Sequence, residues 1–346
     1  MKFLLYYFLK IYIKIGLFFY AKKTTVLGKE NIPKKGAILF VANHPNALID
    51  PLLIATNTKR KIHFLVRAAV FKKPTIAKIL NVIGLMPVYR IRDGIKQLSK
   101  NDAIFNNCQE LLKNQKTLLI FPEGSHNRKR TIRPLSKGFT RILYGAIEKY
   151  PDLKIHIVPI GITYQNSSNY PSKVALIFGE PILANNFYAI DNKNTLIKEL
   201  KTQISDQLKN LTVHINDDEN YNTITTALNK TAIDYTDVNK SNELIKKCAY
   251  PSKKKIEKEN KLLYYSIILN SFIPYLIWKS LSEKIPEIEF TDTFRFALGI
   301  TLFPFFYALQ SFIISFFFST EIALTYFVSS LLLVLLYTKT TAINAG

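Results

Sequence analysis

The stretch GAILFVANHPNALIDP at residues 36–51 decides the fold, because an apolar run ends there in a polar turn. Residues 36–42 are uniformly apolar and have the length of a buried strand. The turn that follows, at residues 43–51, holds His44 and Asp50. Open α/β sheets place their functional sites just beyond the carboxyl ends of their strands, so this junction is a candidate site.

The turn at residues 43–51 is expected to be short and irregular. Pro45 can begin a helical turn but cannot continue one, and Pro51 pushes Asp50 toward extended backbone. Such a turn can fold Asp50 back onto the His44 ring. The carboxylate would then fix the tautomer and leave the other ring nitrogen free to accept a proton. Taken alone, a histidine near an aspartate is more often structural than catalytic.

Apolar runs and helical stretches alternate around this junction. Further buried strands are predicted at residues 63–66, 86–89, 117–121, 155–162 and 174–178. Helices are predicted near residues 50–57, 73–83, 94–113 and 137–149, and from an apolar stripe at residues 196–208. This alternation predicts an α/β fold with a mostly parallel central sheet flanked by helices.

Three more patches stand at predicted strand ends, in the order GLMPVYR (84–90), FPEGS (121–125) and VPIG (158–161). Together with the His44 turn, they resemble the four sequence blocks of the PlsC-like glycerolipid acyltransferases. The resemblance covers roughly residues 25–190. Each piece alone is unspecific, but the combination in this order and spacing is highly specific.

The resemblance implies that His44 and Asp50 are catalytic. His44 would act as the general base that removes a proton from the acceptor hydroxyl, and Asp50 would orient it. Arg90, or less exactly Arg92, would bind the acceptor phosphate, because a guanidinium matches a phosphate bidentately. The other implied substrate-binding residues are Asn43, Phe121, Pro122, Glu123, Gly124, Ser125 and Pro159. The acyl donor is acyl-CoA or acyl-carrier protein, and neither a cofactor nor a metal is expected.

Two departures from the family pattern bear on the acceptor. Five residues separate His44 from Asp50 where four are common, and the resulting HxNxxxDP form is similar to fungal glycerol-phosphate and dihydroxyacetone-phosphate acyltransferases and their bacterial relatives. The third block reads FPEGSH where FPEGTR or FPEGTS is commoner. Lysophosphatidate is the acceptor expected from the family as a whole. Glycerol 3-phosphate or another lysolipid is the alternative.

A third reading is a non-enzymatic, lipid-binding membrane protein with a vestigial site. The four residues His44, Asp50, Arg90 and Glu123 are all intact, which argues against it.

The charge balance points to an anionic partner. The 346 residues include 47 Lys and Arg against 25 Asp and Glu, a formal charge of +22, yet 48% are apolar. Such a chain suits an anionic membrane or a nucleic acid. The charge lies beside apolar segments and no nucleic-acid module is present, so the membrane is favoured. The basic runs at residues 59–61 and 128–130 either contact lipid headgroups or donor phosphates, or are solvated surface.

The C-terminal part holds three apolar runs. Residues 296–320, 322–338 and 262–278 carry no charge. The last of these runs contains Asn270 and Pro274 and could instead be re-entrant or kinked. About 20 residues cross a bilayer core, so the first run spans comfortably and the other two sit at the lower limit.

Orientation follows from the charges beside these runs. Lysines precede the run at 262–278, and the connector after it, at residues 279–295, is acidic. Basic flanks stay in the cytoplasm, so everything up to residue 261 is expected there. If all three runs span, the C-terminus ends outside.

Residues 1–23 predict a helix that lies in the membrane interface. Lys10 and Lys14 interrupt its apolar stretch, which therefore resembles a signal peptide only loosely. An ordinary core helix is the alternative. The expected domains are an interfacial or membrane-embedded helix at 1–24, a catalytic domain at 25–210, a polar, partly helical connector at 211–260 and a transmembrane region of two to three spans at 261–346. We expect the protein on the cytoplasmic face of the inner or plasma membrane.

Overall fold

The computed structural model describes residues 2–89, 94, 96, 99–188, 192–231, 233–248, 260–285 and 287–343. Arg90 and Arg92, to which the acceptor phosphate was assigned, lie outside the described residues.

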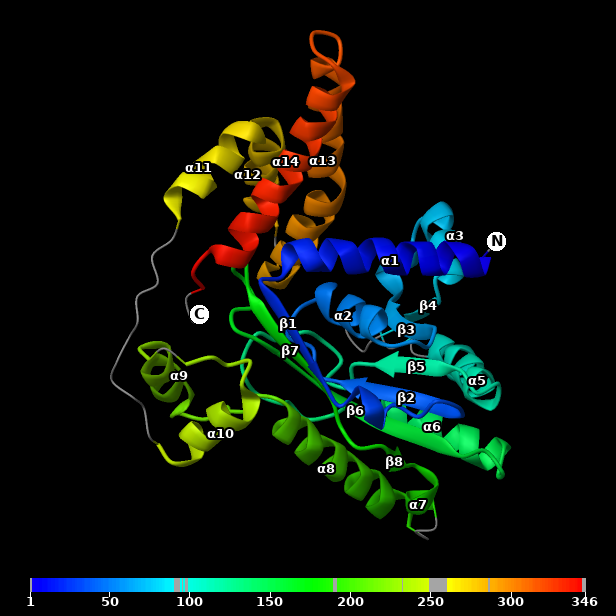
Figure 1. Cartoon of the computed structure of the whole chain (residues 1–346). Helices are drawn as coiled ribbons and strands as arrows, with labels where there is room; N and C mark the ends of the chain where they lie inside the picture. Colours follow the sequence, from blue (N-terminus) through cyan, green and yellow to red (C-terminus); the bar gives the residue numbers. More distant parts are fainter. Residues whose placement is uncertain are drawn as a thin grey trace.

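One mixed sheet forms the centre of the protein (Figure 1). The strand order is β1-β7-β6-β2-β5-β3-β4, with β8 beside β6. Its strands are β1 (Lys23–Leu27), β2 (Ala37–Ala42), β3 (Ile62–Arg67), β4 (Leu85–Val88), β5 (Thr117–Ile120), β6 (Ile155–Tyr164), β7 (Lys173–Phe178) and β8 (Ile182–Leu183). β6 pairs with β7 and β8 antiparallel, and the other pairs are parallel. The mostly parallel α/β fold is confirmed. The pattern missed β1, whose first three residues are polar.

Helices cover both faces of the sheet, because the central strand β2 is apolar on both. Its residues 37, 39 and 41 join a core formed with α5 (Lys100–Lys113), α6 (Gly138–Lys149) and α8 (Lys193–Leu211). Its residues 38, 40 and 42 face α1 (Lys2–Tyr20) and α2 (Ile49–Asn57). The short helix α3 (Pro74–Val82) packs beside the edge strand β4, and α7 (Asn185–Tyr188) packs against α6 and α8. Strict alternation along a doubly buried strand explains this layering.

The connector at residues 211–260 is more than a linker. Its helices α9 (Tyr221–Asn229) and α10 (Val238–Lys246) enclose a small apolar core that packs on β7 through Ala175. Arg130 donates to the carbonyls of Tyr164 and Gln165, at 2.9 Å each, and stacks on the buried Tyr235 ring at 3.6 Å. Arg130 thus joins the end of β6 to the connector through Tyr235 and is not a solvated surface residue.

Arg60, in the other basic run, has the same kind of role. Its guanidinium donates to the Thr117 hydroxyl at 2.6 Å and to the Gly36 and Gln115 carbonyls at 2.7 Å each. These bonds tie the entry of β3 to the neighbouring strands β2 and β5. The Arg60 side chain is therefore used within the protein and does not contact lipid headgroups or donor phosphates.

The C-terminal part forms four helices, of which two are long. They are α11 (Lys261–Asn270), α12 (Phe272–Ser282), α13 (Thr291–Ile314) and α14 (Thr320–Thr340). Segments Ile288–Ile314 and Thr320–Thr340 are long and apolar enough to cross a membrane. The run at 262–278 is instead divided at Ser271 into two short helices, so it is no single straight span. Pro274 sits in the first turn of α12, where its missing N–H removes no helical bond.

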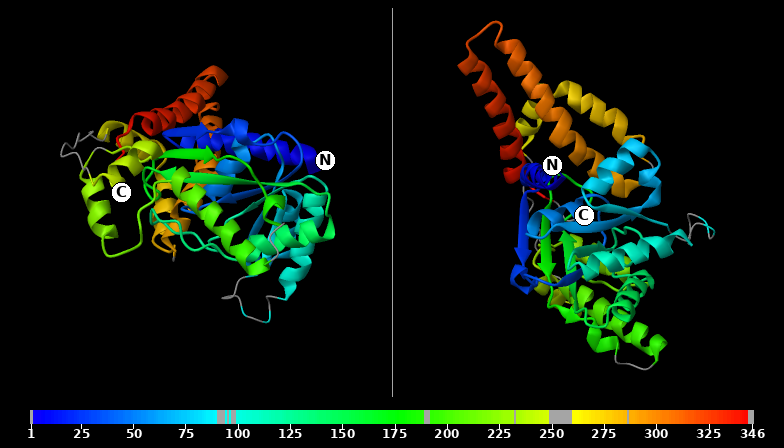
Figure 2. Two further views of the ribbon diagram at one scale, coloured as in Figure 1. Left: turned by 90° about the horizontal axis from the view of Figure 1, so that it is seen from below. Right: turned by 90° about the vertical axis from the view of Figure 1, so that its right-hand side faces the viewer.

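The long helices pair as a hairpin that projects beyond the sheet and its flanking helices (Figures 1 and 2). The end of α14 returns to the end of α1: Lys22 Nζ donates to the Thr341 carbonyl and Lys339 Nζ to the Phe18 carbonyl, both at 2.7 Å. The described part of the chain therefore ends beside α1.

Candidate functional site

Three parallel neighbours, β6, β2 and β5, bring the candidate residues to one edge of the sheet. His44 follows the carboxyl end of β2, Phe121 follows β5, and Tyr164 is the last residue of β6. Parallel strands end at the same edge, so three segments far apart in sequence meet there. The first and third sequence blocks are thereby joined.

His44 and Asp50 form the pair expected from the sequence. His44 Nδ1 lies 2.8 Å from Asp50 Oδ2, and their side chains are 15% and 0% exposed. The backbone differs from the expectation, because Asp50 lies in the first turn of α2 and is not extended. Pro51 is accommodated there because a first-turn N–H has no helical acceptor. The start of α2 thus places the Asp50 carboxylate within hydrogen-bonding distance of His44 Nδ1.

Asp50 is buried, and its two oxygens accept three hydrogen bonds. Besides His44, the Asn46 backbone N–H donates to Oδ2 at 2.7 Å and the Tyr164 hydroxyl donates to Oδ1 at 2.7 Å. Burial raises the pKa of the Asp50 carboxyl, and these donors, led by His44, oppose the rise. The carboxylate is thus held in one orientation, which fixes the ring that it faces.

The third sequence block contacts the His44 ring through Phe121. The Phe121 ring stacks on the imidazole, with centroids 3.9 Å apart and planes within 12°. Glu123, whose side chain is 3% exposed, pairs with Arg133 at 2.7 Å, and Arg133 also donates to the Ser125 hydroxyl at 3.0 Å. Burial raises the pKa of Glu123 and Arg133 opposes the rise. Gly124 takes φ 76°, a left-handed turn that glycine adopts without strain.

The remaining predicted residues hold the backbone around this pair. Asn43 uses both ends of its amide on Ile162 of β6, donating at 2.9 Å and accepting at 2.8 Å. The Pro122 carbonyl accepts from the Ser136 N–H at 2.8 Å. Pro159 is buried in β6, between the stretches that pair with β8 and with β7, where a strand tolerates proline. In this structure these three contacts are structural.

The C-terminal segment also contributes to the site, which the sequence did not indicate. Asp292, in the first turn of α13, accepts from Asn46 Nδ2 at 2.9 Å, from the Tyr20 hydroxyl at 2.8 Å and from Arg295 at 2.6 Å. Its carboxylate is buried. Asn46 is the residue whose backbone N–H holds Asp50, so Asp292 supports the catalytic turn from behind.

A second contact from this segment reaches the ring of His126. His126 Nε2 lies 3.2 Å from Glu287 Oε2, and the His126 ring meets His44 edge-on, with centroids 5.9 Å apart. The acidic connector at 279–295 therefore lies beside the site. The run at 262–278 that precedes it is broken at Ser271, as the kinked alternative allows.

A small cavity of about 40 Å³ opens beside the pair. His44, Glu123 and Arg128 contribute to its wall. A buried carboxylate on Nδ1 leaves Nε2 of the neutral imidazole as the proton acceptor, and a basic side chain stands nearby. This arrangement can remove a proton from a hydroxyl. Among the described residues, no serine hydroxyl is hydrogen-bonded to His44, and the Ser125 hydroxyl accepts from Arg133.

The comparisons with known proteins agree with this geometry. Residues 23–163 match the family model described as Acyltransferase. Glycerol-3-phosphate O-acyltransferase 1 of Saccharomyces cerevisiae is 28% identical over 281 residues, which cover 56% of this chain and 37% of that protein. A probable 1-acyl-sn-glycerol-3-phosphate acyltransferase of Mycoplasma pneumoniae is 28% identical over 208 residues, 54% of this chain and 73% of the relative. This chain thus spans little more than a third of the yeast protein.

A solved structure also resembles the chain. The PlsC lysophosphatidate acyltransferase from Thermotoga maritima is 21% identical, with a TM-score of 0.40, and the match covers 56% of this chain and 73% of the other.

Proposed function

We propose that this protein, whose residues 23–163 match the Acyltransferase family model, transfers a fatty acyl group from an acyl thioester to the hydroxyl of lysophosphatidate (1-acylglycerol-3-phosphate). The observation that carries the proposal is the His44–Asp50 pair, 2.8 Å apart at the end of β2. The yeast and Mycoplasma relatives are named for acyl transfer to glycerol 3-phosphate and to its 1-acyl form.

In the proposed reaction, the acceptor hydroxyl attacks the thioester carbonyl while His44 Nε2 takes its proton. A new C–O bond forms, the C–S bond breaks, and the proton passes from His44 to the departing thiolate. Asp50 stabilises the transient imidazolium, as a carboxylate does for a catalytic histidine elsewhere. A general base contributes typically about 10²–10⁴-fold. No cofactor enters this scheme, and acyl-CoA or acyl-carrier protein supplies the acyl group.

The substrate-binding part of the proposal concerns phosphate and glycerol. Arg90 remains our candidate for the acceptor phosphate, on the strength of the VYR motif. Glu123 and Gly124 shape the neighbouring wall, and Arg128 adds positive charge there. Glycerol 3-phosphate is the alternative acceptor, favoured by the five-residue spacing between His44 and Asp50.

A two-acceptor, two-donor assay tests the reaction. The full chain in detergent micelles is given lysophosphatidate or glycerol 3-phosphate, each with acyl-CoA or acyl-carrier protein. We expect kcat/KM at least about tenfold higher with lysophosphatidate, since a tenfold preference needs only about 1.4 kcal/mol of transition-state binding. The opposite preference would establish the alternative acceptor. Absence of transfer with all four combinations would refute the enzymatic proposal.

We also propose that the protein is held at the cytoplasmic face of an anionic membrane. The described part of α1 exposes an apolar stripe, and the hairpin α13–α14 is largely exposed and apolar. The stripe consists of Leu4, Phe8, Ile11, Ile15 and Phe18. Such a helix lies in the interface with its apolar side in lipid. The hairpin would cross the membrane twice and the catalytic domain would stay on one side.

Cysteine labelling tests this topology. Cys248 is exposed, whereas Cys108 is buried and its pKa is raised to about 12 by burial, so only Cys248 should react. Phe317, at the hairpin turn, is 77% exposed. In sealed vesicles, an impermeant maleimide should label Cys248 in one orientation. It should label the F317C variant, in a Cys248→Ser background, only in the other. Labelling of both from the same side, or no labelling of F317C in either orientation, would overturn the two-span topology.

A further inference from the structure

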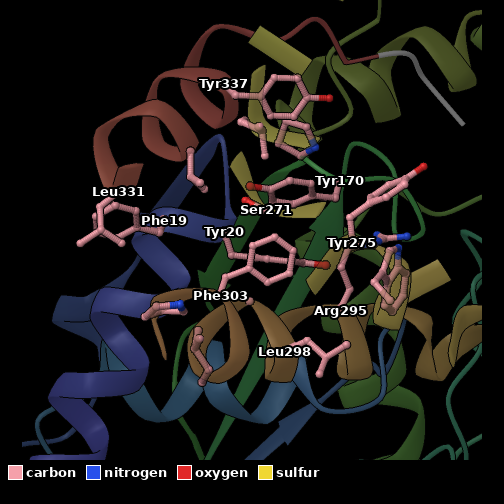
Figure 3. A pocket seen from close by; sticks show the side chains of 18 of the residues that line it. Phe19, Tyr20, Tyr170, Ser271, Tyr275, Arg295, Leu298, Phe303, Leu331 and Tyr337 are labelled. Carbon is pink, nitrogen blue, oxygen red and sulfur yellow. The ribbon is translucent and has the colours of Figure 1, made fainter. Parts of the chain in front are cut away.

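A second and much larger pocket lies among the helices that face the membrane (Figure 3). Its volume is about 560 Å³, within the range of about 300–1,000 Å³ that small-molecule sites occupy. Its walls come from α1, α11, α12, α13 and α14, together with the loop at residues 169–171. All five helices lie outside residues 23–163, the part of the chain that matches the acyltransferase family model.

The pocket has an apolar side and a polar side. Figure 3 shows Phe19 and Leu331 on one side and Tyr275 and Arg295 on the other. The Arg295 guanidinium is held by Asp292 at 2.6 Å and by the Ser168 carbonyl at 3.1 Å, and it lies over the Trp278 ring. An amphiphile would therefore bind with its chain toward Leu331 and its polar end toward Arg295.

The polar side of the pocket adjoins the catalytic turn. Arg295 bonds Asp292, Asp292 bonds Asn46, and the Asn46 N–H bonds Asp50. Two residues thus separate the pocket wall from the catalytic carboxylate. A ligand with its polar end at this wall is therefore linked to the catalytic turn through hydrogen bonds.

We propose that this pocket binds the acyl chain of the lysophosphatidate acceptor. The inference rests on the acyl transfer proposed above and names how the acceptor enters. Lysophosphatidate resides in the bilayer and reaches the pocket through the membrane-facing helices, whereas acyl-CoA and acyl-carrier protein approach from water. Glycerol 3-phosphate has no chain and would leave the pocket unused, so the pocket favours the lysolipid acceptor.

Gly299 offers a direct test. It lines the pocket one helical turn after Arg295, and a Cβ added there meets no atom within 4 Å. A Gly299→Leu side chain therefore adds bulk at the pocket wall without a clash at its Cβ, and leucine favours the helix more than glycine does. Thr301, on the same helix, is exposed and outside the pocket, so Thr301→Leu is the matched control.

The kinetic result expected for Gly299→Leu is a rise of about tenfold or more in the KM for lysophosphatidate, because part of the chain loses its apolar site. The KM for the acyl donor should not change, and Thr301→Leu should match the wild type in both constants. A rise confined to the donor KM would assign the pocket to the donor chain. Unchanged constants would remove it from the reaction. Either result overturns the inference.

Photo-cross-linking gives a readout that does not depend on turnover. Lysophosphatidate with a diazirine in its chain is irradiated with the full-length His44→Ala protein in micelles. The label should fall on peptides of α11, α13 and α14 that line the pocket, and Gly299→Leu in the same background should reduce it. If the pocket is labelled but the wild type shows no turnover, the acyl-transfer proposal is refuted and the lysophosphatidate site in the pocket stands. Absence of pocket labelling would sink this inference.

Discussion

Replacing His44 with alanine should reduce kcat/KM by about 10²–10⁴-fold, the range that a general base contributes. The loss should lie mainly in kcat, because the proton is removed only as the hydroxyl attacks. His44 is partly exposed at the end of β2, and it packs on Phe121 without filling the core. The His44→Ala protein should therefore keep its fold and its attachment to membranes.

Asp50→Asn is the companion variant. Asp50 Oδ2 accepts from both His44 and the Asn46 N–H. An amide oxygen in its place can accept from the same donors, but it carries no charge to stabilise the imidazolium. Comparable histidine–carboxylate pairs lose about 10⁴-fold in kcat when the carboxylate becomes an amide. Tyr164→Phe removes only the hydrogen bond to Oδ1 and should lower kcat by about tenfold at most.

Steady-state assays in micelles, with thermal unfolding and flotation on vesicles as controls, measure this series. The expected order of activity is wild type, Tyr164→Phe, then Asp50→Asn and His44→Ala. If His44→Ala, folded and membrane-bound, kept more than a tenth of wild-type kcat, the imidazole would not be the base.

Local signals account for what the sequence predicted. Each of the six predicted strands is an apolar run bounded by turn residues, and each forms in the sheet. The blocks at His44 and Phe121 directly follow two of these strands, so parallel topology alone brings them together. Tyr164 was missed because the apolar run was ended at residue 162, two residues before β6 ends.

Contacts between distant segments account for what the sequence could not predict. Asp292 lies 246 residues from Asn46 in the sequence, and no motif in the residues flanking either one indicates the contact. In the sequence, Asp292 counts only as one acidic residue of the connector at 279–295, from which the orientation in the membrane is inferred. The structure uses the same carboxylate as a buried acceptor. The break at Ser271 is a different case: Asn270 and Pro274 mark the run at 262–278 as a candidate for a kink, but hydropathy does not give the position of the break.

Asp292 should be a positioning residue, and Asp292→Asn should lower kcat by about tenfold, equivalent to about 1.4 kcal/mol. Its carboxylate accepts from Asn46 Nδ2, and Asn46 holds Asp50 through its backbone N–H. An amide at position 292 loses the charge-assisted bond that fixes Asn46, so Asp50 and His44 sample other orientations. The donor KM should not change, whereas the KM for lysophosphatidate should rise modestly, because Asp292 also holds Arg295 at the pocket wall.

A double-mutant cycle separates positioning from simple destabilisation. Asn46→Ala removes the side-chain amide but keeps the backbone N–H that Asp50 needs, and it should lower kcat about as much as Asp292→Asn. If both act through one contact, the double variant should be no slower than either single one, since coupled residues are not additive. Tyr20→Phe is the matched control for kcat, because it removes another donor to Asp292 and leaves Asn46 in place. Since Tyr20 also lines the large pocket, this variant is compared at saturating lysophosphatidate. Additive losses, or a lower Tm with kcat intact, would show that Asp292 only anchors α13 to the domain. Coupling would show that a helix on the membrane side of the protein sets the geometry of the base.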